Sequence, residues 1–231
     1  KKFISKKIIN KNFDAIKFAK IKSFTGFKNL SVLSKNDNYD EFFFKALNKF
    51  FKKEKIEREI DAIIFASHSR QNEMPIFSAK VQSKFKINNS IICYDLPGSC
   101  SGFTNGLIHA SAFLNSNIAK KNVLLICADA HSQIAEKNLI PVIGDGISCI
   151  LIEKSLTKNV IDFGVDGHEN QILKINSNKK KLTMDGIKVF EFAAKRVPET
   201  YYKSIKKFKK KIDYYSFHQP NKTIHDHLVK K

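Results

Sequence analysis

The chain has 231 residues, enough for one large domain or two fused halves, and its hydrophobic share of 42% allows a sizeable core. Only 9 glycines and 5 prolines argue against a fibrous or disordered chain, and no apolar stretch reaches the roughly 18 residues of a membrane-spanning helix. The 41 basic and 22 acidic residues give a net charge of +19, which favours nucleic acid, an anionic membrane or an acidic protein as partner, unless it reflects only a lysine-rich proteome.

Helical and strand-like patterns alternate along the chain. In order, they predict a helix over 40–52, a strand over 61–67, a helix over 76–85, a strand over 91–96, a helix over 101–114, strands over 122–128 and 147–153, helices over 187–196 and 203–211, and a last strand over 212–217. Residues 166–181 are polar and predict a surface loop. The alternation indicates an α/β protein with a buried sheet, and the stretch near 155–165 is a candidate boundary between two halves.

The four cysteines are Cys93, Cys100, Cys127 and Cys149, and they form no CxxC pair, so a zinc site is not expected. No cofactor is expected either. All except Cys100 lie in apolar strand-like runs, which fits buried thiols in a reducing cytoplasm. The chain begins Lys1-Lys2-Phe3 without a methionine or an apolar leader. We therefore expect no secretory signal, and we expect the sequence to start within a longer chain.

The segment from Asp95 to Phe103 is the first candidate site. A strand ends there, a turn with Pro97 and Gly98 follows, and a helix is predicted to start directly after Cys100. Unpaired N–H groups and the dipole at a helix N-terminus stabilise a thiolate, which is the nucleophilic form of cysteine, and can also hold an oxyanion. The alternative is a cysteine that only packs at the corner between strand and helix.

The second candidate site is the run Phe217-His218-Gln219-Pro220-Asn221, directly after the last predicted strand. A histidine on a loop at a strand end can act as an acid, a base or a hydrogen-bond donor. The alternative is a structural or solvated histidine, and a catalytic role for His218 requires that it meets Cys100 in space.

These residues resemble the ketoacyl-carrier-protein synthase III family of condensing enzymes. The run DLPGSCSGF is similar to the family's nucleophile turn, D-x-x-x-x-C-x-G-F. Weaker matches follow the family's order along nearly the whole chain: Ile4–Phe13 resembles the first loop, Thr25-Gly26 the T-G turn, Met74–Gln82 the helix before the nucleophile, Ile143–Gly146 the F-G-D-G turn, Leu182–Gly186 with Val189-Phe190 the L-x-M-x-G-x-x-V-F stretch, and His218–Asn221 the H-Q-A-N motif.

The resemblance implies a thiolase-like fold, layered αβαβα from two similar halves over 1–155 and 156–231, with the second half cut short. It implies a cytoplasmic homodimer in which Cys100 accepts an acyl group from a thioester, on coenzyme A or a carrier. His218 would then help to decarboxylate a malonyl unit on acyl carrier protein, so that a Claisen condensation follows. Met74, Phe103 and Asn221 are expected to contact the substrate.

The chain also departs from the family pattern. It stops at Lys231, before the family's third catalytic residue, an Asn in G-N-x-x-x-A-S, so we expect it to be C-terminally incomplete. It contains no Trp, whereas the family stacks one on the adenine of coenzyme A, and this favours a carrier-bound or a divergent acyl donor. Lys206, Lys207, Lys209 and Lys210 are candidates for docking the acidic carrier. The alternatives are acyl transfer to an oxygen, nitrogen or sulfur acceptor on the same fold, and a basic nucleic-acid-binding protein, for which no motif is present.

Overall fold

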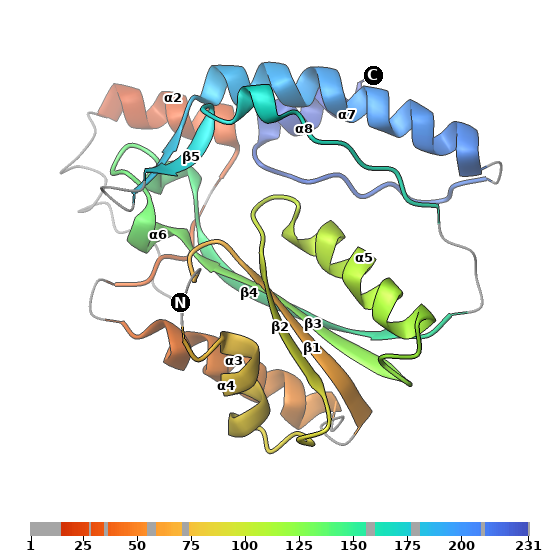
Figure 1. Ribbon diagram of the computed structural model, residues 1–231. Coiled ribbons are helices and arrows are strands. Elements are labelled where there is room, and N and C mark those ends of the chain that lie inside the picture. The colour runs from red at the N-terminus through yellow and green to blue at the C-terminus, as the bar shows by residue number, and fades with distance from the viewer. Residues whose placement is uncertain are drawn as a thin grey trace. The chain divides into compact units, whose positions relative to one another are not determined.

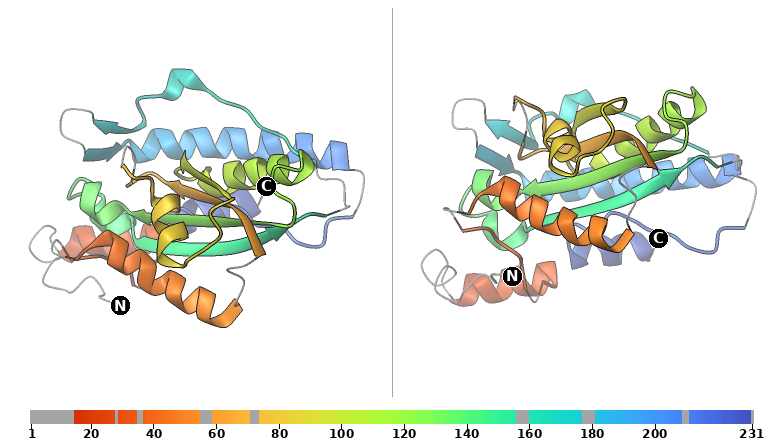
Figure 2. Two further views of the ribbon diagram at one scale, coloured as in Figure 1. Left: turned by 60° about the horizontal axis from the view of Figure 1, so that its bottom comes forward. Right: turned by 90° about the horizontal axis from the view of Figure 1, so that it is seen from below.

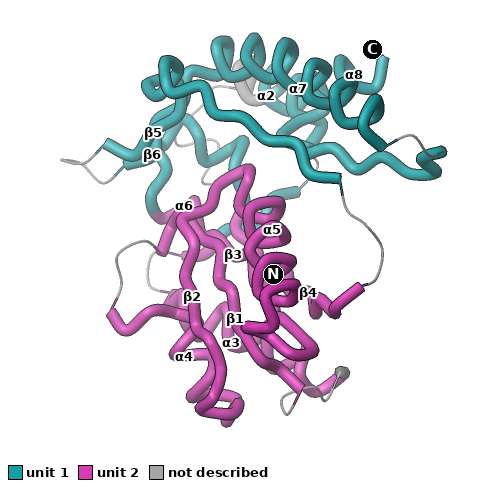
Figure 3. Tube along the Cα trace, turned by 45° about the vertical axis from the view of Figure 1, so that its right-hand side comes forward, with its two compact units in different colours: residues 1–32, 134–144, 157–231 teal, residues 33–133, 145–156 magenta. Residues whose placement is uncertain are grey.

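The computed structural model of the protein describes residues 15–27, 29–34, 37–54, 59–70, 74–155, 160–176, 181–208 and 211–230. The chain divides into two compact units, which Figure 3 shows in different colours. Unit 1 comprises Lys1–Val32, Ile134–Gly144 and Thr157–Lys231, and unit 2 comprises Leu33–Gln133 and Asp145–Leu156. The predicted repeat of two halves over 1–155 and 156–231 stays a prediction. Unit 2 ends at Leu156, which lies within the stretch near 155–165 that the sequence offers as a boundary between two halves.

Unit 2 is built on a four-stranded sheet with the strand order β2-β1-β3-β4 (Figure 1). The strands are β1 (Ile60–Ser67), β2 (Ile92–Pro97), β3 (Asn122–Ala130) and β4 (Asp145–Glu153). β1 pairs in parallel with β2 and β3, and β4 runs antiparallel to β3. The central strands β1 and β3 are continuous apolar runs because both of their faces are covered. The four strands predicted in this part of the chain are confirmed.

Helices cover both faces of this sheet (Figure 2). α3 (Tyr39–Glu54) and α4 (Phe77–Lys84) pack on one face, where Phe43 and Phe77 meet Phe65 of β1. α5 (Gly102–Asn115) packs on the other face, where its residues Ala110 and Leu114 join a separate cluster of buried residues from the sheet. Unit 2 therefore has three layers, and the predicted α/β class and the predicted helices at 40–52, 76–85 and 101–114 are confirmed.

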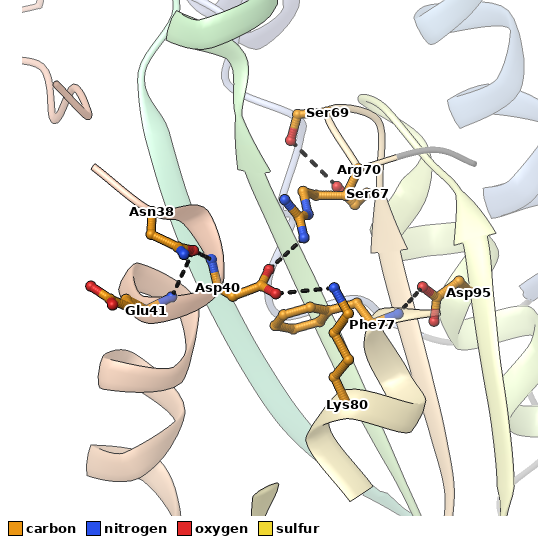
Figure 4. A network of polar contacts seen from close by, with 9 residues as sticks. All are labelled: Asn38, Asp40, Glu41, Ser67, Ser69, Arg70, Phe77, Lys80 and Asp95. Atoms are coloured by element: carbon orange, nitrogen blue, oxygen red, sulfur yellow. Dashed lines mark hydrogen bonds and ion pairs between the residues drawn. The ribbon is translucent and has the colours of Figure 1, made fainter. Parts of the chain in front are cut away.

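Polar contacts fix α3 and α4 to the sheet, as Figure 4 shows. The carboxylate of Asp95 on β2 accepts hydrogen bonds from the backbone N–H groups of Phe77, at 2.7 Å, and Ser78, at 3.0 Å, so it caps the N-terminus of α4. Asp40 in the first turn of α3 receives hydrogen bonds from Arg70, just after β1, and from Lys80 of α4. These contacts hold α3 and α4 at the ends of β1 and β2. The candidate nucleophile turn directly follows β2.

Unit 1 is mostly helical. Its elements are α2 (Ala15–Thr25), the 3-10 helices η2 (Ile140–Val142) and η3 (Gly167–Glu169), the antiparallel pair β5 (Leu173–Asn176) and β6 (Lys181–Met184), α7 (Gly186–Phe208) and α8 (Lys222–Val229). The short α6 (His131–Ile134) lies where the chain passes from unit 2 into unit 1. Ala135, Leu139 and Leu182 form a small core beside β5 and β6. None of the described helices is long and apolar enough to cross a membrane.

Three sequence predictions differ from the structure in unit 1. The helices predicted over 187–196 and 203–211 are one helix, α7, which continues through Pro198. The predicted loop over 166–181 contains η3 and β5. The strand predicted over 212–217 is wrong: residues 211–219 belong to no strand. A strand needs a hydrogen-bonded neighbour, and the described strands of unit 1, β5 and β6, pair with each other.

Candidate functional site

The turn that carries Cys100 joins the end of β2 to the start of α5. The Gly102 N–H donates to the Ser99 carbonyl at 2.9 Å, and the Asn105 N–H donates to the Ser101 carbonyl at 2.9 Å, which begins the helix. Cys100 is exposed in this turn, and the Ser99 hydroxyl lies 4.0 Å from its Sγ atom. The sequence prediction that α5 begins directly after Cys100 is therefore confirmed to within one residue.

Glycines make this turn and the close seating of α5 possible. A Cβ atom on Gly98 would lie 2.7 Å from the Cα atom of Gly102, and one on Gly106 would lie 2.4 Å from a methyl group of Leu125 in β3. Gly98 lies in the turn before α5, whereas Gly102 and Gly106 are four residues apart within α5 and lie on one face of it. These glycines allow the turn, the helix and the sheet to come into close contact.

The other three cysteines lie in a different environment. Burial raises the pKa of Cys127 to about 11, with a further contribution from Asp129, and burial alone raises the pKa of Cys149 to about 11. The pKa of Cys93 is also raised, mainly by burial and then by Asp95. All three are partly buried, whereas Cys100 is exposed. Neutral thiols are poor nucleophiles, so the structure favours Cys100 as the reactive cysteine of this chain.

Polar residues that sequence reasoning did not single out gather at the carboxyl ends of β1 and β3. Asp129 accepts hydrogen bonds from the Ser67 hydroxyl and from the backbone N–H groups of His68 and Ser69, and His131 lies 3.6 Å from its second oxygen. The signal that finds them is topological, because the parallel strands β1, β2 and β3 end at one edge of the sheet. That edge also carries the Cys100 turn.

Asp145 of the G-D-G turn orders the backbone around it. The residue is 6% exposed, and its carboxylate accepts hydrogen bonds from the backbone N–H of Leu33 and from both the N–H and the hydroxyl of Ser132. These contacts fix the start of β4 to the segment that follows β3.

In unit 1 the structure brings together two predicted motifs from opposite ends of the chain. Gly26, with a φ of 73°, lies so close to α8 that a Cβ atom there would meet the Cβ atom of Lys222 at 2.8 Å. The Thr223 hydroxyl donates to the Phe24 carbonyl at 2.8 Å. The T-G turn thus packs against the helix that follows the H-Q-P-N motif. Two motifs that resemble the family therefore lie next to each other in unit 1.

The H-Q-P-N motif ends at the start of α8. The Asn221 side chain accepts a hydrogen bond from the Ile224 N–H at 2.9 Å and caps this helix. His218, three residues earlier, is exposed in the segment before the helix, which has no regular secondary structure. The predicted contact of Asn221 with the substrate stays a prediction, and the observed cap gives this residue a structural role.

The remaining predicted site residues lie on unit 2 and are exposed. Met74 is 97% exposed, and Phe103, in the first turn of α5, is 46% exposed. Their contact with a substrate stays a prediction. Cys100 belongs to unit 2 and His218 to unit 1, so their meeting at one site stays a prediction too. The predicted first loop over Ile4–Phe13 lies outside the described residues, as do Lys209 and Lys210.

Comparisons with known proteins agree with this arrangement. Residues 94–167, which contain the Cys100 turn and the G-D-G turn, match the family model described as 3-oxoacyl-[acyl-carrier-protein (ACP)] synthase III. The chain is 28% identical over 233 residues to the beta-ketoacyl-[acyl-carrier-protein] synthase III of Lactococcus lactis subsp. lactis, and 29% identical over 241 residues to that of Clostridium tetani. Each match covers 91% of this chain and 71% of the relative.

The fold matches as well. The solved structure of 3-oxoacyl-(acyl carrier protein) synthase III from Pseudomonas aeruginosa PAO1 superimposes with a TM-score of 0.86 at 19% identity. That match covers 100% of this chain and 75% of the solved one, and it supports the predicted thiolase-like fold. The nucleophile turn, the order of the motifs and the fold lead to one conclusion: the chain is similar in sequence and in fold to the ketoacyl-carrier-protein synthase III condensing enzymes.

Proposed function

We propose that the protein is an acyltransferase that loads an acyl group from a thioester onto Cys100 and condenses it with malonyl-acyl-carrier protein. The observation that carries this proposal is the exposed Cys100 thiol in the turn that starts α5, within the residues that match the family model. The relatives are named beta-ketoacyl-[acyl-carrier-protein] synthase III, and this chain shares 71% of their length.

The geometry of the turn supports the proposed first half-reaction. The Cys100 thiolate attacks the carbonyl carbon of the acyl thioester, and the N–H groups at the start of α5 stabilise the oxyanion of the tetrahedral intermediate. The carbon–sulfur bond to the donor then breaks, the donor leaves as a thiol with a proton, and an acyl-Cys100 thioester remains. Phe103 in the first turn of α5 and Met74 before α4 are the proposed contacts for the acyl chain.

The second half-reaction assigns a role to His218. The ring donates a hydrogen bond to the thioester oxygen of the malonyl group while carbon dioxide leaves, so the negative charge moves onto that oxygen as an enolate. The enolate carbon attacks the acyl carbonyl, and the bond to Cys100 breaks. The product is a ketoacyl group on the carrier, and the cysteine thiol is regenerated. Asn221, which begins α8, is the proposed further contact of the malonyl group.

The partners in this proposal are acyl carrier protein and an acyl thioester on coenzyme A or on a carrier. The chain has no Trp to stack on the adenine of coenzyme A, which favours the carrier as donor, and a net charge of +19 favours an acidic partner. We further propose a cytoplasmic homodimer, as the family resemblance implies. The thiols of Cys93, Cys127 and Cys149 fit a reducing compartment.

The experiment measures ketoacyl product and carbon dioxide after the chain is mixed with acyl thioester and malonyl-acyl-carrier protein. Wild type is expected to form both in equal amounts. The Cys100→Ala variant is expected to form no ketoacyl product, and His218→Ala is expected to lose at least about a hundredfold in rate, since it lacks the hydrogen-bond donor. A Cys100→Ala variant that condenses at the wild-type rate would overturn the proposal.

A second function is acyl transfer to an oxygen, nitrogen or sulfur acceptor on the same Cys100 intermediate. It is favoured if wild type forms the acyl-enzyme, gives no malonyl-dependent product and passes the acyl group to an alcohol, amine or thiol. Nucleic-acid binding ranks below both functions, because the basic charge is its only support.

A further inference from the structure

The turn that carries Cys100 packs against the end of β1. Ser67 is the last residue of this strand, and its carbonyl accepts a hydrogen bond from the Gly98 N–H at 3.2 Å. Ala66, one residue earlier, is 4% exposed, and a Cβ atom on Gly98 or on Gly102 would lie 3.4 Å from the Cβ atom of this alanine. The end of β1 therefore supports the glycines on both sides of the cysteine.

The side chain of Asp129 holds this end of β1. One oxygen of its carboxylate accepts hydrogen bonds from the Ser67 hydroxyl at 3.1 Å and from the backbone N–H groups of His68 and Ser69 at 2.7 Å each. The Ser69 hydroxyl in turn accepts from the Ala130 N–H at 2.9 Å. Side-chain bonds in both directions therefore attach the end of β1 to the end of β3.

A carboxylate is well suited to this position. Three donors converge on one of its oxygens, and an ionised carboxylate can accept all three because it carries only acceptor groups. Its second oxygen lies 3.6 Å from the Nε2 atom of His131 in α6. Hydrogen bonds to a charged acceptor are stronger than those between neutral groups, so the Asp129 side chain gives the end of β1 a charge-assisted attachment.

A second aspartate ties the same two strands together at their other ends. Asp61, the second residue of β1, accepts hydrogen bonds from the backbone N–H groups of Lys121 and Asn122, where β3 begins. Asp61 lies at the far end of β1 from the turn. A role in stability alone would be shared by both aspartates, whereas an effect on Cys100 is expected only from Asp129.

We propose that Asp129 is a positioning residue for Cys100: its carboxylate fixes the end of β1, which holds the Gly98 peptide, so that the thiol stays at the N-terminal end of α5. The proposal rests on the proposed function, because it takes Cys100 as the reacting group. Asp129 acts through the backbone of Ser67 and Gly98.

Loss of the carboxylate would allow the end of β1 to move, and the turn with it. The Cys100 thiol would spend less time beside the N–H groups of α5, which stabilise its anion, and would react more slowly. Asparagine at position 129 keeps an acceptor oxygen without the charge, and alanine keeps neither. His68 and His131 neighbour Asp129 and meet an uncharged side chain in both variants, so the comparison isolates the hydrogen bonds from the charge.

The test measures the rate at which iodoacetamide alkylates Cys100 in the full chain at about pH 7, followed by peptide mass. Asp129→Ala is expected to react about two- to tenfold more slowly than wild type, the factor that corresponds to one net intramolecular hydrogen bond. Asp129→Asn is expected to recover most of the rate, because its amide oxygen can accept the same bonds. Asp61→Ala is the matched control and is expected to react at the wild-type rate.

Thermal unfolding of each variant checks that the fold is kept. Ser67→Ala, which removes one donor to Asp129 and keeps the backbone bonds, replaces Asp129→Ala if that variant does not fold, and it is expected to slow Cys100 by about twofold. Acylation by a thioester is recorded in parallel. Alkylation needs no acyl transfer, so a wild type that is alkylated but never acylated defeats the proposed function and still tests Asp129.

Three results would overturn the positioning role. The first is an Asp129→Ala variant, or in its place Ser67→Ala, that is alkylated at the wild-type rate. The second is an Asp129→Asn variant as slow as Asp129→Ala, because the loss would then follow the charge. The third is an Asp61→Ala variant that slows Cys100 as much as Asp129→Ala does, because only the general stability of the sheet would then matter.

Discussion

At the scale of single residues, the Cys100 turn depends on one position that admits no side chain. Gly98 approaches the Cα atom of Gly102 so closely that a methyl group there would lie 2.7 Å from it, within backbone rather than a movable side chain. The sequence pattern of a strand, a Pro-Gly turn and a helix predicted a sharp turn here. The close contact explains why the turn requires glycine.

Gly98→Ala is expected to lower the free energy of unfolding by about 1–3 kcal/mol, because the added methyl group forces β2 and α5 apart. Gly146→Ala is the matched control, since a Cβ atom there meets nothing within 4 Å. Chemical denaturation of both variants measures the difference. Equal stability of the two variants would contradict the close contact.

The reactivities of the Cys100, Cys127 and Cys149 thiols are expected to depend differently on pH. Because Cys127 and Cys149 have pKa values raised to about 11, their reaction with iodoacetamide stays slow near neutral pH and rises only as the pH approaches that value. Exposed Cys100 is expected to be labelled first at about pH 8. Peptide mapping after partial labelling checks the order, and first labelling at Cys127 or Cys149 would contradict it.

At the scale of the elements, α4 is held by a carboxylate from a strand. Asp95, which sequence reasoning noted only as the first residue of the nucleophile motif, caps α4 through the N–H groups of Phe77 and Ser78. Asp95→Ala is expected to cost about 1 kcal/mol of stability, and Asp95→Asn, which keeps an acceptor oxygen, to cost less. Thermal and denaturant unfolding measure both, and an equal loss in the two variants would contradict the cap.

Elements with strong local patterns could be predicted from the sequence. Strands β1 and β3 are continuous apolar runs, and helices α3 and α5 carry a helical spacing of apolar residues, so their local sequence alone indicates them. The strand expected over 212–217 could not be judged that way, because a strand forms only with a neighbour, and residues 211–219 belong to no strand in the structure. The pairing β5–β6 was missed for the same reason, since polar residues conceal it.

The candidate site could likewise be predicted only where local sequence determines it. The position of Cys100 before a helix follows from local sequence, whereas the network of Asp129 with residues 67–69 joins segments about 60 residues apart. Such contacts depend on strand order, which no local pattern encodes. The contact of the T-G turn with α8, over 199 residues, belongs to the same class.

At the scale of the whole molecule, the net charge of +19 predicts electrostatic docking of the acidic carrier. Lys207 is paired with Asp162, as is Lys203, so charge reversal at these lysines would also break an ion pair. A variant that keeps these two ion pairs reverses Lys206, Lys209 and Lys210. It is expected to weaken carrier binding at low salt by about tenfold or more, since three charges change sign.

The matched control reverses Lys49, Lys52 and Lys53 of α3, which changes the net charge by the same amount at another place. Binding of the carrier is measured by titration at low and at high salt. Equal weakening in the two variants would mean that only the total charge matters, and would contradict a docking surface at 206–210.

The most direct test of the central claim is the intact mass of the chain after incubation with short acyl thioesters, on coenzyme A and on carrier protein. The account predicts that wild type gains the mass of one acyl group, that Cys100→Ala gains none, and that the carrier-bound donor reacts faster. No acyl adduct on wild type with either donor, or an adduct that persists in Cys100→Ala, would contradict the claim that Cys100 is the acyl-accepting nucleophile.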